Sequence, residues 1–238
     1  MTELLRHHPF FENKSIDSCV YLEQQGYCNA NYLIIAEGKK YIVRKLLQTD
    51  TDRAFEFRVQ QLAFAQGIAA EPLVLDEVKS LMIFAFVEGV HRETLSQADL
   101  EQLAFILTKL HAIRVESTPI PVHIENPNDA VAEACAYIAQ TPKEYVLCHN
   151  DLNPKNILFG ESIKLIDFEY AGVNDRYFDL ACVCVEFALT SEEEQTFLSH
   201  YTKAYNEKKF DAYKTVYTTL CKEWFENHCT TDIIQNIL

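Results

Sequence analysis

The chain has 238 residues, of which 48% are hydrophobic and 24% charged, and its formal net charge at pH 7 is −14. This balance is that of an ordinary globular protein with enough chain to bury a core. The negative charge argues against nucleic acid or an anionic membrane surface as a partner, because each phosphate contact needs a cation.

The first third of the chain predicts a small β-rich lobe with one helix. Two β-rich runs, 31–37 and 40–46, flank Glu37-Gly38-Lys39, which indicates a hairpin. Residues 52–66 carry apolar side chains at helical spacing, and Gly67 ends that helix. A second hairpin is expected over residues 73–76 and 81–87.

From Ser96 onward the pattern is mainly helical. Ser96 and Asp99 form a start like a capping box for a helix with leucines on one face. Three short β-runs follow between residues 145 and 168. Further helices are expected at 128–140, 178–189, 192–206 and 210–228. The chain thus predicts an α+β fold with a β-rich lobe over 1–87, a larger helical lobe over 88–238 and a short hinge near 86–89.

The compartment is indicated by what the sequence does not contain. The longest clean apolar run, 81–87, is far too short to span a bilayer, so no membrane insertion is expected. The N-terminal residues have no apolar core of an export signal. The eight cysteines form no C-x-x-C pair and no cluster with the spacing of a zinc site. We therefore expect a cytoplasmic protein without a disulfide framework.

Chemistry is concentrated in residues 148–181. Asn156 lies five residues after Asp151 of His149-x-Asp151, and Asp167 begins a D-F-E triplet at the end of an apolar run. H-x-D-x-x-x-x-N followed by D-F-x is typical of kinase-type phosphotransferases. One carboxylate must accept the proton of an attacking hydroxyl, while a second carboxylate and an amide oxygen hold magnesium, which takes hard oxygen ligands.

These motifs resemble those of the choline/ethanolamine kinases and, more broadly, of aminoglycoside-phosphotransferase-like small-molecule kinases. The resemblance is closest over residues 149–158, 166–170 and 174–179, together with Glu186. It implies a two-lobed protein-kinase-like fold, ATP and Mg²⁺ as cofactors, and phosphoryl transfer to the hydroxyl of a small amino alcohol.

The same resemblance implies roles for individual residues. Asp151 is expected to be the catalytic base that contacts the substrate hydroxyl, and Asn156 and Asp167 the magnesium ligands. Arg44 falls where the family places a strand cation on the nucleotide phosphates, and Glu56 is expected to pair with it.

The resemblance also places the nucleotide. Residues 25–31, which include Gly26 and Asn29, occupy the position of the phosphate-covering loop. Backbone groups from Ala85 to Val87 are expected to receive the adenine.

The implied acceptor pocket centres on Glu186, with Tyr213, Tyr217 and Trp224 on one face of the last long helix. A quaternary ammonium binds aromatic faces and a carboxylate. The family often has W-x-x-W in that helix, but here Cys221 takes the first position, and Ser191 stands where some members carry a tyrosine. These differences leave room for a smaller amine, so choline is expected first and ethanolamine second.

Structural interpretations stand beside these roles. His149 is expected to brace the catalytic loop, Asp179 to bond its backbone, and Arg176 to pair with an acid. Glu186 could instead pair with an arginine or lysine of its own lobe. The aromatic side chains of the last helix could instead pack in the core.

Two further functions stay open. One is a phosphotransferase acting on thiamine or an aminoglycoside. The other is a non-catalytic pseudokinase that binds a ligand, because the phosphate-covering segment holds a single glycine. A protein kinase is not expected, since no A-P-E-like segment follows Asp167. The sequence leaves the oligomeric state open.

Overall fold

The structure, a computed structural model, describes residues 1–22, 29–47 and 51–235, with side chains as far as residue 226. It divides into two compact units. Unit 1 comprises Met1–Arg92 and Lys155–Tyr170, and unit 2 comprises Glu93–Pro154 and Ala171–Leu238. Residues 155–170, which the sequence placed in the second lobe, thus make their contacts with unit 1. The division into a nucleotide-binding lobe over 1–87 and a catalytic lobe over 88–238 stays a prediction.

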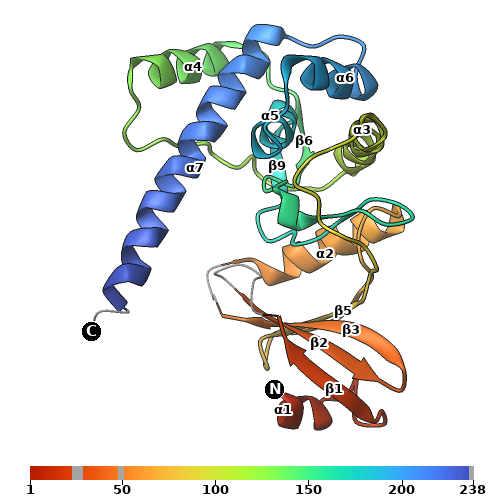
Figure 1. The fold of residues 1–238 in the computed structure, drawn as a ribbon. Coiled ribbons are helices and arrows are strands. Elements are labelled where there is room, and N and C mark those ends of the chain that lie inside the picture. The colour runs from red at the N-terminus through yellow and green to blue at the C-terminus, as the bar shows by residue number, and fades with distance from the viewer. Residues whose placement is uncertain (23–28, 48–50, 236–238) are drawn as a thin grey trace. The chain divides into compact units, whose positions relative to one another are not determined.

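Unit 1 is built on a five-stranded antiparallel sheet of order β1-β2-β3-β5-β4 (Figure 1). Its strands are β1 (Ile16–Tyr21), β2 (Asn29–Ala36), β3 (Lys39–Leu46), β4 (Pro72–Asp76) and β5 (Leu81–Ala85). Both expected hairpins are present. Glu37 and Gly38, at φ 51° and 72°, form the two-residue turn between β2 and β3, the geometry that matches the strand twist.

The two faces of this sheet are covered by different helices. Tyr41 and Val43 of β3 pack with Leu5 of the short helix α1 (Thr2–Arg6) and with Phe11. The alternate β3 residue Leu46 packs against Phe57 of α2 (Arg53–Ala65) on the other face, as the two-residue period of a strand requires. Asp52 begins α2 by accepting the N–H of Phe55 at 2.9 Å.

The segment that returns to unit 1 contains η1 (Pro154–Asn156) and a small ladder of β7 (Ile157–Leu158) and β8 (Lys164–Leu165). Val90 and Phe159 exchange backbone hydrogen bonds of 2.9 Å, and Leu165 N donates to Ile68 O at 2.8 Å. The β-run expected over 163–168 pairs over two residues alone. It nevertheless brings Asp167 to the sheet that carries Arg44.

Unit 2 is mainly helical, as expected. Its elements are α3 (Gln97–Ala112), α4 (Asp129–Gln140), α5 (Tyr177–Glu186), α6 (Ser191–Tyr201), α7 (Glu207–Gln235) and the antiparallel pair of β6 (Tyr145–Cys148) and β9 (Gly172–Asp175). The capping box of Ser96 and Asp99 is confirmed at the start of α3. None of the helices in the described part of the chain is long and apolar enough to cross a membrane.

Helix α7 packs on both α4 and α5 (Figure 1). Ala212 and Val216 of α7 form a core cluster with Val131 and Ala134 of α4. On the other side, the ring of Tyr217 meets that of Phe178 in α5 edge to face, with centroids 5.5 Å apart. Helix α5 is almost wholly buried, so it fixes the surrounding elements of unit 2.

Candidate active site

Arg44 is the centre of a buried charge cluster in unit 1. Its Nη1 lies 2.9 Å from Glu56 Oε1 and 2.9 Å from Asp167 Oδ1. The expected pair of Arg44 with Glu56 is therefore present, although the predicted role of both residues toward a nucleotide stays a prediction. Burial lowers the pKa of Arg44, but the carboxylates of Asp167 and Glu56 raise it by more, so the net shift is upward. The guanidinium thus stays charged.

A second arginine completes the cluster and was not expected from the sequence. Arg53 donates from Nη1 to Glu56 Oε2 at 2.7 Å and from Nη2 to Glu169 Oε1 at 3.3 Å. Asn29 donates from Nδ2 to the other Glu169 oxygen at 2.6 Å. Burial is the main cause that raises the pKa of Glu169. The usable signal was the spacing of Arg53 and Glu56, three residues apart on one helix face.

Residues 29–31 are the described part of the predicted phosphate-covering loop, and Asn29 is the first of them. Its side chain binds Glu169, so it belongs to the same cluster as Arg44. Residues 25–28, including Gly26, lie outside the described residues.

The predicted magnesium ligands lie at one end of the β7–β8 ladder. Ile157 pairs with Leu165, and Ile166 N donates to Asn156 O at 3.0 Å. Asp167, the next residue, has a left-handed backbone with φ 64°, which is uncommon outside glycine and occurs often at functional sites. An amide oxygen and a carboxylate are a suitable donor set for Mg²⁺.

Ala85 and Val87 lie where β5 leaves the sheet. Ala85 N donates to Glu71 O at 2.9 Å, and Phe86 N donates to Lys40 O at 3.3 Å. The end of β5 and the residue that follows it are thus each held by a backbone hydrogen bond to a neighbouring segment. The predicted adenine contact of Ala85 would use its carbonyl group, because its N–H is already engaged.

In unit 2, Asp179 holds the loop that carries Asp151. Its two carboxylate oxygens accept the backbone N–H groups of His149 and Asn150, each at 2.8 Å. Asn150 has φ 65°, and its side-chain oxygen accepts Asn174 Nδ2 at 2.9 Å. The expected role of Asp179 is confirmed. Arg176 pairs with Glu144 at 2.7 Å, also as expected.

Glu186 contacts the thiol of one cysteine, and the loop that carries Asp151 contacts the thiol of another. Glu186 Oε1 accepts the hydroxyl of Tyr217 at 2.8 Å and lies 3.7 Å from Cys221 Sγ. Burial raises the pKa of Cys221 to about 11, and the charges of Glu186 and Asp151 add to the shift.

Cys182 of α5 is the cysteine that the catalytic loop contacts. Leu152 N, next to Asp151 in the chain, donates to Cys182 Sγ at 3.1 Å. Cys182 and Glu186 are one helical turn apart. Burial raises the pKa of Cys182, and the charges of Glu186 and Asp151 contribute.

The structure tests two alternatives: that Glu186 pairs with an arginine or lysine of its own lobe, and that the aromatic side chains of α7 pack in the core. Among the side chains that the structure describes, no arginine or lysine forms an ion pair with Glu186. Tyr213 is buried and stacks on Tyr177 at 6.1 Å, so this ring is a core residue. Tyr217 is also buried, whereas Trp224 is half-buried beside Phe225.

Comparison with known proteins identifies the family. The family model described as choline/ethanolamine kinase matches residues 87–236. The chain belongs to the choline/ethanolamine kinase family. It is 24% identical over 216 residues to protein LicA of Haemophilus influenzae, covering 76% of this chain and 80% of that protein. It is 39% identical over 173 residues to ethanolamine kinase 2 of Rattus norvegicus, covering 59% of this chain and 44% of the relative.

Solved structures agree with the family. Choline kinase LicA from Streptococcus pneumoniae superposes with a TM-score of 0.79 at 22% identity, over 94% of this chain and 89% of that one. A spectinomycin phosphotransferase bound to ADP and spectinomycin gives a TM-score of 0.68 at 17% identity, over 91% and 82%. The α+β fold is thus that of the protein-kinase-like phosphotransferases. This member of the choline/ethanolamine kinase family is a phosphotransferase with a hydroxyl group as acceptor.

Proposed function

We propose that this protein transfers the γ-phosphoryl group of ATP to the hydroxyl of a small amino alcohol, with choline as the first substrate and ethanolamine as the second. The observation that carries the proposal is that Leu152 N, next to Asp151 in the chain, donates at 3.1 Å to Cys182 Sγ, which lies one helical turn before Glu186 on α5. The carboxylate proposed for the substrate cation, Glu186, and the one proposed for its hydroxyl, Asp151, then lie in the same part of unit 2. Choline and ethanolamine carry a cation two carbons from their hydroxyl.

Each acceptor-side residue has a proposed task. Asp151 accepts the proton of the substrate hydroxyl. Glu186 binds the ammonium, and Trp224 offers a ring face to it. Tyr217 contributes to binding of the ammonium indirectly. Its hydroxyl donates to the Glu186 carboxylate at 2.8 Å, and its own ring is buried. Its hydrogen bond orients Glu186 toward the substrate.

The nucleotide side is proposed in unit 1. Arg44 binds the phosphates, held in direction by Glu56, while Asn29 lies at the start of the described part of the covering segment. Ala85 and Val87 contact the adenine. Asn156 and Asp167 would hold magnesium, whose charge offsets that of the phosphates when it is bound.

The two favoured acceptors differ in what they ask of the pocket. A quaternary ammonium has no N–H donor and depends on ring faces, whereas a primary ammonium can donate to Glu186 directly. Cys221 beside Glu186 supplies a small side chain in place of a ring. This is the reason that ethanolamine is kept as the second substrate.

We also propose a cytoplasmic location. Six cysteines of the described chain are free, and several of them are buried. Reduced thiols of this kind suit a reducing compartment.

The test is ATP consumption with and without Mg²⁺ in the presence of choline, ethanolamine, thiamine or an aminoglycoside. Turnover with one amino alcohol, lost with EDTA, is expected. Asp151→Asn should lower kcat by about 10²- to 10⁴-fold, the usual value of a positioned base, while ATP binding measured by calorimetry persists. Asp129→Asn removes an exposed carboxylate of the same lobe and should retain activity.

Other outcomes separate the open alternatives. Turnover with thiamine or the aminoglycoside alone would move the acceptor outside the proposed class. ATP binding without turnover on any acceptor would favour a pseudokinase. Normal turnover by Asp151→Asn would refute the assigned base.

A further inference from the structure

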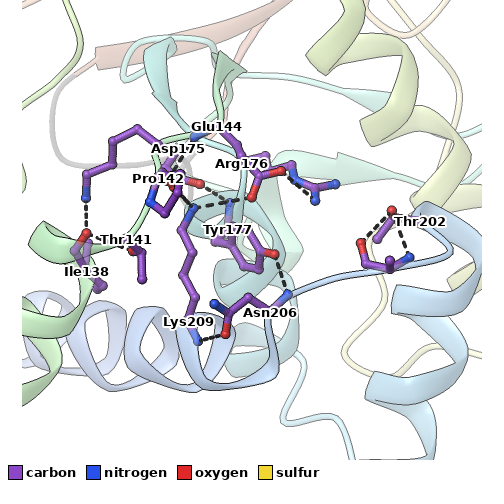
Figure 2. Close-up of polar contacts among 12 residues, drawn as sticks. Ile138, Thr141, Pro142, Glu144, Asp175, Arg176, Tyr177, Thr202, Asn206 and Lys209 are labelled. Carbon is purple, nitrogen blue, oxygen red and sulfur yellow. Dashed lines mark hydrogen bonds and ion pairs between the residues drawn. The ribbon is translucent and has the colours of Figure 1, made fainter.

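Lys209, in the first turn of α7, is a buried lysine (Figure 2). Only 2% of its side chain is exposed, and its Nζ lies 2.7 Å from Asp175 Oδ2, whose side chain is 1% exposed. The same ammonium donates to Pro142 O at 2.8 Å and to Glu144 Oε1 at 3.4 Å. It also lies 4.4 Å from the centroid of the Tyr177 ring.

Burying an ammonium and a carboxylate removes both from water, and this desolvation offsets most of their attraction. All three N–H donors of a lysine need acceptors in such a place, and here Asp175 at the end of β9 and Pro142 and Glu144 just before β6 supply them. The contacts therefore fix the position of the α7 start relative to that strand pair. Stability alone does not require such an arrangement, since an apolar pair of similar volume would serve as well.

Asp175 lies on a segment that also holds the catalytic loop. Its neighbour Asn174 donates to Asn150 Oδ1 at 2.9 Å, from the opposite face of β9. Asp179, further along the segment, accepts the N–H groups of His149 and Asn150. Residues 174–179 thus hold the loop with Asn174 and Asp179 and hold α7 with Asp175.

Other contacts at the start of α7 support the same anchor. Asn206 N donates to the hydroxyl of Tyr177 at 2.7 Å, and Asn206 Oδ1 accepts Lys209 N at 3.0 Å (Figure 2). Tyr213, one turn beyond Lys209, stacks on Tyr177. Tyr217 and Trp224 follow about two and four turns after Lys209 on the same helix.

We propose that the ion pair of Lys209 and Asp175 is a positioning link between the acceptor-binding helix α7 and the catalytic loop. Through this pair, the segment that orients Asp151 also sets the position of Trp224 and of Tyr217, whose hydroxyl donates to Glu186, at the site proposed for the substrate ammonium. Lys209 and Asp175 are positioning residues, which act through others rather than on the substrate. This inference rests on the proposed function for its kinetic consequence.

The kinetic test compares Lys209→Met with Lys208→Met. Lys208 is the exposed neighbour on the same helix, so it controls for the loss of one lysine. Lys209→Met and Asp175→Asn should each raise the KM for the amino alcohol by about tenfold, while the KM for ATP stays within about twofold. The double variant should be no worse than either single one, because the two residues act as one unit.

A second measurement needs no activity. Trp224 is the single tryptophan of the chain, so its emission reports on α7 directly. Lys209→Met should shift this emission and speed amide exchange in α7, and Lys208→Met should change neither. If either single variant does not fold, the double variant Asp175→Asn with Lys209→Met avoids an unpaired buried charge and takes its place.

The outcomes are distinguishable. Equal changes in both KM values, an unchanged KM for the amino alcohol, or Trp224 emission identical to that of Lys208→Met would each overturn the link. A wild-type protein without turnover on any amine would overturn the proposed function instead. Emission and exchange would then decide the link alone, with a response specific to Lys209→Met in its favour.

Discussion

Arg44 and Asp167 are 123 residues apart in the chain, yet Arg44 Nη1 lies 2.9 Å from Asp167 Oδ1. The first comes from the middle of a strand and the second from the residue pair that follows β8. The same Nη1 also holds Glu56. A single guanidinium group therefore joins strand, helix and returning segment within unit 1.

Removing this guanidinium should destabilise unit 1 strongly. The side chains of Arg44 and Glu56 are 8% and 1% exposed, so Arg44→Met leaves a buried carboxylate with Arg53 as its remaining cation. We expect a loss of about 3 kcal/mol in the free energy of unfolding, the usual effect of breaking a buried pair, measured by urea titration. Arg58→Met, at an exposed position of α2, should change it by less than about 0.5 kcal/mol. Equal effects of the two variants would contradict the buried cluster.

Replacing Glu186 should weaken binding of the amino alcohol without changing binding of ATP. Glu186→Gln keeps the acceptor oxygen for Tyr217 and removes the charge that would bind an ammonium. The KM for the amino alcohol should rise by about 10- to 100-fold, as for loss of a charged partner, with the KM for ATP unchanged. Glu192→Gln, which is exposed on α6, is the matched control. A rise in the KM for ATP alone would place the residue elsewhere in the reaction.

His8 should make the stability of unit 1 depend on pH. Its Nδ1 accepts Phe10 N at 3.1 Å and its Nε2 lies 3.2 Å from Asp76 Oδ2. Burial, and then the charge of Lys79, lower the pKa of His8 below 6.5. The unfolded chain thus binds this proton at a higher pH than the folded chain does, so the free energy of unfolding falls as the pH drops below about 6.5.

The measurement is urea unfolding at pH 7.5 and 5.5. His8→Asn retains an acceptor for Phe10 N and removes the titrating ring, so it should flatten the pH dependence, which for one group is at most about 1.4 kcal/mol per pH unit. His7→Asn, at a side chain that is 76% exposed, should leave the dependence as in the wild type. Stability that rises toward pH 5.5 would reverse the assigned sign.

Replacing Ala188 by glycine should stabilise the protein. It has φ 47° just after α5, and Leu189 N closes the helix end on Cys184 O at 3.0 Å. A left-handed residue with a Cβ costs about 1 kcal/mol relative to glycine, so Ala188→Gly should raise the free energy of unfolding by about that amount. Ala136→Gly, exposed in the interior of α4, should lower it by about 0.5–1 kcal/mol. The same sign for both would show that backbone conformation is not the cause.

Gly160 and Gly172 should differ in their tolerance of alanine. A Cβ on Gly160 would lie 2.7 Å from the backbone oxygen of Glu88, whereas one on Gly172 would meet the end of the Ile120 side chain at 2.6 Å. The Ile120 side chain can turn away, whereas the backbone next to Glu88 is held by the hydrogen bonds between Val90 and Phe159. Gly160→Ala should therefore cost about 2 kcal/mol, and Gly172→Ala clearly less, as measured by thermal unfolding. A larger loss at Gly172 would contradict this ranking.

Local chemistry explains which parts of the structure the sequence predicted. The Glu37–Gly38 turn, the capping box at Ser96 and the helical period of α2 depend on residues within one or two turns of each other. The loop contacts of Asp179 followed from a motif whose members share one segment. The composition of such segments carries their structure directly.

What could not be predicted depends on distant pairs. Arg53 and Glu169 are 116 residues apart, so the local spacing that pairs Arg53 with Glu56 gives no sign of the contact with Glu169. Strand β9, with the residues Gly-Val-Asn-Asp, has little β propensity and forms because Tyr145–Cys148 pairs with it. In the sequence Lys209 likewise does not differ from its neighbour Lys208, and only the fold shows that it is buried against Asp175.

The return of residues 155–170 to unit 1 bears on how the chain folds during synthesis. When the ribosome has completed Arg92, all residues of the sheet and of α2 have been synthesised, but Asp167 and Glu169, which pair with Arg44 and Arg53, have not. At 5–20 residues per second they appear on the order of ten seconds later. The nascent N-terminal segment thus has Glu56 to pair with its two arginines, and one positive charge of the cluster stays uncompensated until the segment that follows Asp151 has left the tunnel.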